Sequence, residues 1–161
     1  MTNSKIEFYL RLILIIGLVS IISAYFIEYV LGHQPCNLCL IERIPYGFSI
    51  ILITLNYFFK KNEKFIILLL ILTFSFSFAI SVYHLGIEQG IFKESAVCGL
   101  KNMTEIISKE EILKQLQEKT VSCKDVTFRI FGLSLTSINI LLSLILTTLL
   151  TKIYISYEKN K

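Results

Sequence analysis

Long apolar stretches separated by short polar segments dominate the pattern of hydrophobic and polar positions along the chain. No Asp, Glu, Lys or Arg occurs in residues 12–27, 44–59, 65–84 and 130–151. A helix needs about 20 mostly apolar residues to cross a membrane, and the first two stretches reach that length only by extending past Glu28 and back towards Cys39. The pattern therefore predicts transmembrane helices at about 9–31, 40–59, 65–86 and 130–152.

These helices define an all-α membrane protein, a four-transmembrane-helix bundle in a single integral membrane domain, 1–161. A short outer loop at about 32–39 and a long one at about 87–129 follow from the spacing, with a tight turn at 60–64 on the other side. The composition agrees, since 54% of the residues are hydrophobic and only 17% are charged. The alternative of a signal peptide at the N-terminus is weaker, because the first apolar run is longer than about 7–15 residues and Tyr25 and Phe26 occupy the place of small cleavage-site residues.

The placement of positive charge predicts the orientation in the membrane. The short outer loop has no Lys or Arg, and the seven in the long loop are balanced by seven acids. The basic residues of the opposite side are Lys5, Arg11, Lys60, Lys61, Lys64, Lys152, Lys159 and Lys161. Because Lys and Arg gather on the cytoplasmic side, we expect both termini in the cytoplasm.

The long loop contains one predicted short helix. Ser108 and Glu111 form a capping-box pattern, and Ile107 and Ile112 stand where a hydrophobic staple would. This helix either packs on the surface of its own loop or lies flat on the membrane.

The four cysteines all fall in the two outer loops, where an oxidising compartment favours disulfides. Cys36 and Cys39 form a Cys-x-x-Cys pair beside the start of the second helix, and free N–H groups and the helix dipole stabilise the reactive thiolate there. No strand pattern supports a thioredoxin-like unit, and a passive staple so short would stabilise little. Cys98 and Cys123 suit an exposed, exchangeable disulfide, and their wide spacing argues against a zinc site made by the four cysteines.

Two further residues suit chemistry with a bound acceptor. Arg43 lies one helical turn after Cys39 and could stabilise negative charge on that sulfur or on an acceptor, or else reach the headgroups. Glu42 is either its counter-charge or faces water. His84 could hydrogen-bond the acceptor or relay a proton, or be an interfacial histidine satisfied by water. Pro45 interrupts the hydrogen bonding of a helix that starts at Cys39, and the sequence offers no reason for it.

Several segments together resemble the DsbB family, the quinone-linked membrane oxidants of bacterial thiol oxidases. The resemblance covers nearly the whole chain in order, through "PCNLCLIER", "YHLGIEQG", the Cys98/Cys123 pair and "CKDVTFRIFGLSL". The vitamin K epoxide reductase family has a similar bundle, but its loop cysteines precede the Cys-x-x-Cys pair, and here the order is reversed.

The resemblance implies a reaction sequence. A reduced DsbA-like protein of thioredoxin fold attacks Cys98, the released Cys123 exchanges with Cys36, and Cys39 passes two electrons to a quinone held by Cys39, Arg43 and His84. The quinone would be ubiquinone or menaquinone. The resemblance also implies a multi-pass protein of the bacterial inner membrane, with the cysteine loops in the periplasm.

We further expect a monomer in membrane lipid, with no nucleic-acid partner and no bound metal. A non-enzymatic membrane scaffold with structural disulfides is the alternative.

Overall fold

Long helices make up most of the part of the chain that can be described. The computed structural model describes residues 3–58, 62–94, 98, 121–124, 128–130 and 132–159. Within them lie the helices α1 (Asn3–Tyr29), α2 (Asn37–Phe58), α3 (Glu63–Glu88) and α5 (Leu135–Lys159). All four are long and apolar enough to cross a membrane, which confirms the predicted four-helix membrane fold.

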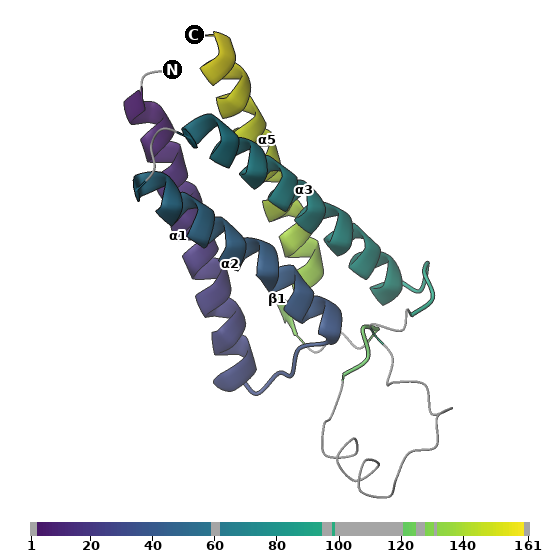
Figure 1. The fold of residues 1–161 in the computed structure, drawn as a ribbon. Coiled ribbons are helices and arrows are strands. Elements are labelled where there is room, and N and C mark those ends of the chain that lie inside the picture. The colour runs from purple at the N-terminus through teal and green to yellow at the C-terminus, as the bar shows by residue number, and fades with distance from the viewer. Residues whose placement is uncertain are drawn as a thin grey trace, which may run out of the picture.

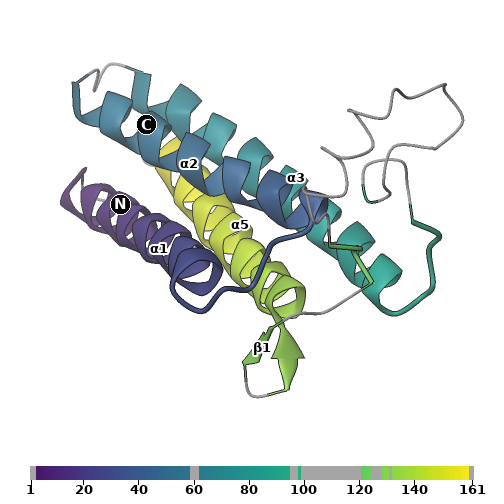
Figure 2. The ribbon, with the colours of Figure 1, turned by 90° about the horizontal axis from the view of Figure 1, so that it is seen from below.

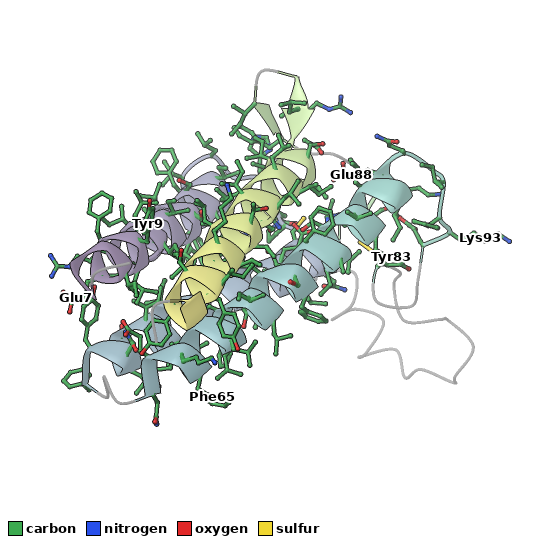
Figure 3. The ribbon with its side chains drawn as sticks, turned by 90° about the horizontal axis from the view of Figure 1, so that it is seen from above. Glu7, Tyr9, Phe65, Tyr83, Glu88 and Lys93 are labelled. Atoms are coloured by element: carbon green, nitrogen blue, oxygen red, sulfur yellow. A yellow bond between two sulfur atoms is a disulfide. The ribbon has the colours of Figure 1, made fainter. Side chains whose placement is uncertain are left out.

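The helices run side by side as a bundle, with α3 packed on both α2 and α5, and α1 packed on α2 (Figure 1, Figure 2). Both chain termini lie at one end of the bundle. The α1–α2 connection and the described parts of the α3–α5 connection lie at the other, which we call the cysteine end because Cys36, Cys39, Cys98 and Cys123 pack together there. Figure 3 shows the same polarity, with Glu7 and Tyr9 at one end and Glu88 and Lys93 at the other.

Apolar side chains both fill the bundle and cover its outside. The core of the half nearer the termini includes Ile13, Ile53, Ile67, Phe74 and Leu150, all at most 2% exposed. Large side chains also point outward, among them Phe58 at 77% exposed and Phe76 at 61% exposed. An apolar outer surface this extensive suits contact with lipid rather than water.

The helix ends differ from the predicted ranges in ways that matter for the site. α1 begins at Asn3 and ends at Tyr29, earlier than predicted at both ends. α2 begins at Asn37, not at about residue 40, so Cys36 directly precedes the helix. The helix then continues through the buried Pro45, which lies in its third turn and cannot donate a hydrogen bond to the preceding turn.

A small hairpin precedes the last helix and adds two short strands to the predicted all-helical fold. β1 (Arg129–Ile130) pairs antiparallel with β2 (Leu133–Ser134), and Gly132 between them has a φ of 83° (Figure 2). Ser134 then caps α5, because its hydroxyl oxygen accepts a hydrogen bond from the Ser137 N–H at 3.3 Å. The predicted start of this helix at residue 130 is therefore too early, and its predicted end at 152 falls short of Lys159.

The end of α3 turns the chain sharply at the cysteine end. Gly90 has a φ of 75°, its N–H donates to the Ile87 carbonyl at 3.0 Å, and the Ile91 N–H donates to the Gly86 carbonyl at 2.8 Å. This pair of bonds is a Schellman motif. The short helix predicted near Ser108 lies outside the described residues, as do residues 59–61 of the predicted inner turn.

Candidate active site

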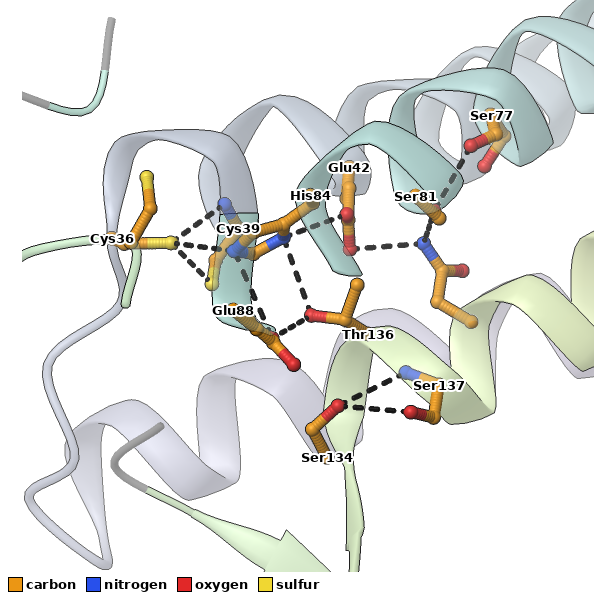
Figure 4. A network of polar contacts seen from close by, with 12 residues as sticks. Cys36, Cys39, Glu42, Ser77, Ser81, His84, Glu88, Ser134, Thr136 and Ser137 are labelled. Atoms are coloured by element: carbon orange, nitrogen blue, oxygen red, sulfur yellow. Dashed lines mark hydrogen bonds and ion pairs between the residues drawn. The ribbon is translucent and has the colours of Figure 1, made fainter. Parts of the chain in front are cut away.

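Cys36 occupies the N-cap of α2, and its sulfur is the focus of several contacts. The backbone N–H of Cys39 donates to Cys36 Sγ at 3.3 Å, and the two sulfurs lie 2.7 Å apart (Figure 4). The sulfur thus takes the place that a serine or aspartate oxygen usually has at a helix start. Free N–H groups and the helix dipole at this position favour a negatively charged sulfur.

His84 of α3 contacts the same sulfur. Its Nε2 lies 3.5 Å from Cys36 Sγ, and its Nδ1 donates to Glu42 Oε1 at 2.9 Å (Figure 4). The Thr136 hydroxyl lies 3.2 Å from the same Nδ1 and donates to Glu88 Oε1 at 2.5 Å. His84 is only 1% exposed, so it is a buried link between the cysteine pair and two carboxylates, not an interfacial histidine satisfied by water.

These contacts make the Cys36 sulfur strongly acidic. The hydrogen bond from the Cys39 thiol is the largest cause, with smaller contributions from His84 and from the Cys39 N–H. Burial opposes them, and the net effect lowers the pKa of Cys36 from 9.0 to about 5. Cys36 is therefore a thiolate at neutral pH when the pair is reduced.

The polar network continues along the bundle beyond His84. Asn139 of α5 donates from Nδ2 to Glu42 Oε2 at 3.1 Å and to Ser81 Oγ at 2.7 Å, and Figure 4 labels both of these acceptor residues. The Tyr46 hydroxyl donates to Asn139 Oδ1. Glu42 is 8% exposed and has partners on both carboxylate oxygens. A buried carboxylate held in this way costs little, because hydrogen bonds replace its lost hydration.

A cavity of about 330 Å³ lies beside the network, between α1, α2 and α5. Its walls are mainly apolar, and the α1 wall includes the small residues Ser20, Ser23 and Ala24. Cys39, Glu42 and Arg43 also line it, whereas Cys36 and His84 do not. One lining residue, Val19, is 57% exposed on the outside of the bundle, so the cavity reaches the surface that faces lipid.

Arg43 is held at the cavity wall by α1. Its Nη1 lies 2.5 Å from Glu28 Oε2, and its guanidinium lies 5.2 Å from the centre of the Tyr25 ring. Both charged side chains are less than one-fifth exposed. Glu28, not Glu42, is therefore the counter-charge of Arg43, and Arg43 does not simply extend to the headgroups.

Cys98 and Cys123 form a disulfide with a Cα–Cα distance of 5.5 Å. The two cysteines are 4% and 2% exposed and share a buried cluster with Cys36, Leu38 and Ile87. The expectation of an exposed disulfide is wrong, because this apolar cluster covers it. The same packing brings the loop disulfide and the Cys36–Cys39 pair together at one end of the bundle.

The predicted site residues thus divide into two groups. Cys39 and Arg43 line the cavity, while Cys36 contacts His84 and packs with the loop disulfide. The sequence did not reveal Glu28 as the partner of Arg43 or Glu42 as the partner of His84. Their charge alone could have indicated these roles, since an ionisable residue inside a membrane helix usually has a partner and a function.

The fold and this site define a multi-pass membrane protein built around two cysteine pairs. Comparison with known families gives the same class: the model of disulfide bond formation protein DsbB matches residues 7–153. The chain belongs to the DsbB family. It is 30% identical over 155 residues to the uncharacterized protein RP370 of Rickettsia prowazekii (strain Madrid E), covering 94% of this chain and 90% of that protein. No solved structure matches the chain significantly.

Proposed function

We propose that this protein is a thiol:quinone oxidoreductase that re-oxidises a DsbA-like thioredoxin-fold protein and passes two electrons to a membrane quinone. One observation carries the proposal. The Cys36–Cys39 pair stands between the loop disulfide and the lipid-facing cavity, with Cys36 packed towards the first and Cys39 lining the second. A pair that connects a water-soluble thiol with a lipid-soluble acceptor needs this position.

Thiol–disulfide exchange accounts for the first half of the reaction. The dithiol of the partner attacks Cys98 of the loop disulfide, and Cys123 is released as a thiolate. Cys123 then attacks Cys36 of the oxidised Cys36–Cys39 pair and releases Cys39. The second thiol of the partner attacks the mixed disulfide, which oxidises the partner and releases Cys98. Cys98 then attacks Cys123 of the Cys36–Cys123 disulfide, which restores the loop disulfide and leaves Cys36 and Cys39 reduced. The low pKa of Cys36 makes it a good leaving group in the last of these exchanges, in which Cys36 is the sulfur that is released.

The cavity residues fit a quinone as the acceptor of the second half. A volume of about 330 Å³ lies at the small end of the range for ligand pockets and suits a single ring rather than a whole lipid. The apolar walls suit the ring, Cys39 supplies the reacting sulfur, and Arg43 supplies a donor for an oxygen atom. A bound quinone supplies the capacity to take up two electrons and two protons. Ubiquinone and menaquinone both meet these requirements.

The protons that the quinone takes up need a route to the cavity. Glu42 accepts a hydrogen bond from His84 Nδ1, and His84 Nε2 faces Cys36 Sγ. Since Glu42 also lines the cavity, it can move a proton from His84 to the cavity side. In this proposal His84 transfers protons between the Cys36 sulfur and Glu42. Because His84 does not line the cavity, we do not assign it a contact with the quinone.

The same proposal gives the protein its place in the cell. We place it as a monomer in the bacterial inner membrane, with both termini in the cytoplasm and the cysteine end in the periplasm. The positive charge near the termini and the family's link to disulfide formation support this orientation.

Filling the cavity tests the proposal. We expect Ala24→Phe to raise the KM for the quinone about tenfold or more, because the phenyl ring of the new side chain fills part of the cavity that Cys39 also lines. Exchange between the partner and the loop disulfide should keep its rate. The matched control is Ala79→Phe, which makes the same change at an exposed position of α3 and should leave both rates unaltered. If the two variants have the same KM and rate for the quinone, the quinone does not bind in this cavity.

The buried Cys98–Cys123 disulfide is also what a membrane scaffold with structural disulfides would contain. Thiol trapping in cells separates the two functions. With Cys123→Ser, the oxidoreductase accumulates a mixed disulfide between Cys98 and a soluble thioredoxin-fold protein. A scaffold accumulates none.

A further inference from the structure

We propose that the reduced Cys36–Cys39 pair, together with His84, is a binding site for a zinc-class divalent cation. The spacing of the cysteines predicts no such site, because Cys98 and Cys123 are too far apart in the chain to be the second pair of a four-cysteine site. The fold supplies a different set of ligands. Cys36 Sγ, Cys39 Sγ and one nitrogen of His84 lie within 4.8 Å of one another. This inference goes beyond the thiol:quinone reaction and needs only that the pair be reduced.

The donor distances suit a tetrahedral zinc ion. With Zn–S and Zn–N bonds of about 2.3 and 2.0–2.1 Å, a sulfur and a nitrogen ligand lie about 3.5 Å apart. Cys36 Sγ and His84 Nε2 are 3.5 Å apart. The two sulfurs, now 2.7 Å apart, must separate by about 1 Å to bind the same ion. Cys39 is partly exposed beside the cavity, so its side chain has room to make that change.

A fourth ligand and an orienting partner lie next to these three. Glu88 Oε1 is 3.9 Å from His84 Nε2, about 0.5 Å more than the separation of an oxygen and a nitrogen ligand on one tetrahedral zinc ion, so the carboxylate must move by about that much to bind. Glu42 accepts a hydrogen bond from the other ring nitrogen, Nδ1. A carboxylate in this position fixes the histidine tautomer that presents Nε2 to a metal, an arrangement that metal-binding histidines commonly have.

Binding would depend on the redox state of the pair. At neutral pH Cys36 is already a thiolate, so the cation replaces only the proton of the Cys39 thiol, which leaves as H⁺, and both sulfurs then bind the cation as thiolates. No electron moves. The disulfide form of the pair has no thiolate to offer, so it should not bind the cation. Conversely, a bound cation occupies both sulfurs and keeps the pair from forming its disulfide.

The experiment uses the detergent-solubilised full chain carrying Cys98→Ser and Cys123→Ser, so that only the pair offers thiols. We expect Co²⁺ to bind one per chain when the pair is reduced, with thiolate-to-cobalt charge-transfer bands and the intense visible bands of tetrahedral Co²⁺, and Zn²⁺ to displace it. The same chain with the Cys36–Cys39 disulfide should give no such spectrum. X-ray absorption of the Zn²⁺ complex should show two sulfur ligands at about 2.3 Å and nitrogen or oxygen ligands at about 2.0–2.1 Å.

Variants separate this site from chance binding by two thiols. We expect His84→Ala to abolish the tetrahedral spectrum and Glu42→Gln to weaken Zn²⁺ binding about 10–100-fold. His33→Ala changes the only other histidine of the chain and should bind as the parent does. The proposal is overturned if the reduced parent shows no thiolate-to-cobalt bands, or if folded His84→Ala binds Co²⁺ as tightly as the parent. X-ray absorption of the parent tests the site without any change to His84. A bound zinc ion with no nitrogen or oxygen ligand would also overturn the proposal.

Discussion

Cys36 shows how a single residue gains reactivity from its position. It precedes α2, accepts the Cys39 N–H, and faces the Cys39 thiol and His84 at 2.7 and 3.5 Å. Each contact favours the thiolate, and together they outweigh the burial of a residue that is 5% exposed. The reactivity therefore belongs to the arrangement of α2 and α3 around the sulfur and not to the Cys-x-x-Cys motif alone.

The pH dependence of alkylation tests this account of Cys36. In the reduced chain carrying Cys98→Ser and Cys123→Ser, we expect Cys36 to react with iodoacetamide at a constant rate above pH 6 and more slowly as the pH falls through about 5. The sign follows from a lowered pKa, since the reactive thiolate is lost only when acid protonates it. Mass spectrometry of the labelled peptide separates Cys36 from Cys39. An inflection near the ordinary value of 9.0 would contradict the account.

Arg43 and Glu28 provide a second test at the residue scale. Arg43→Gln leaves Glu28 without its ion pair in a mostly buried place, so we expect a lower melting temperature and a quinone KM raised about tenfold or more. Adding Glu28→Gln removes the unpaired charge. The double variant should recover its melting temperature but keep the high KM. A recovered KM would mean that Arg43 only neutralises Glu28 and does not serve the quinone.

At the scale of elements, α3 carries His84 near its end and is followed by a tight turn. A Cβ atom added to Gly86 would lie 2.2 Å from the Phe92 ring, which packs on Tyr83 with ring centres 5.6 Å apart. The Schellman turn at Gly90 directs Phe92 back over this position. Any larger residue at position 86 therefore forces the Phe92 ring to move.

This contact predicts a rescue by a second substitution. We expect Gly86→Ala to destabilise the folded chain by about 1–3 kcal/mol, because the methyl group overlaps the ring of Phe92. Phe92→Ala in the same chain should restore part of that loss by removing the ring. Thermal unfolding in detergent measures both variants. Two results would contradict this contact. In the first, Gly86→Ala leaves the stability unchanged. In the second, the double variant loses the sum of the stability losses of Gly86→Ala and Phe92→Ala measured separately.

The elements also show what the sequence can and cannot predict. The four helices follow from charge-free stretches, since a membrane leaves a chain few other ways to satisfy its backbone. The hairpin at 129–134 was missed because two-residue strands give no periodic signal. The nearness of Cys36, Cys39 and Arg43 follows from helical spacing. The contacts of Glu42 with His84 and Asn139 join three helices, and no local pattern predicts them.

Across the whole molecule, one end of the bundle concentrates the chemistry. The half nearer the termini has an apolar core, while the cysteine end contains the buried network from Cys36 to Asn139, the cavity and the loop disulfide. Cys36 and Cys39 separate two environments there, the loop cluster and the lipid-facing cavity. The central claim is that electrons leave the pair through Cys39 into a quinone in that cavity.

A single-turnover reaction tests the claim most directly. The fully reduced chain carrying Cys98→Ser and Cys123→Ser is mixed rapidly with a ubiquinone or menaquinone analogue, while absorbance follows the quinone and thiol labelling follows the pair. We predict that one quinone is reduced per chain as the Cys36–Cys39 disulfide forms, and that further substitution by Cys39→Ser abolishes the reaction. A pair that stays reduced with both analogues, or a Cys39→Ser chain that reduces quinone at the same rate, would contradict the account.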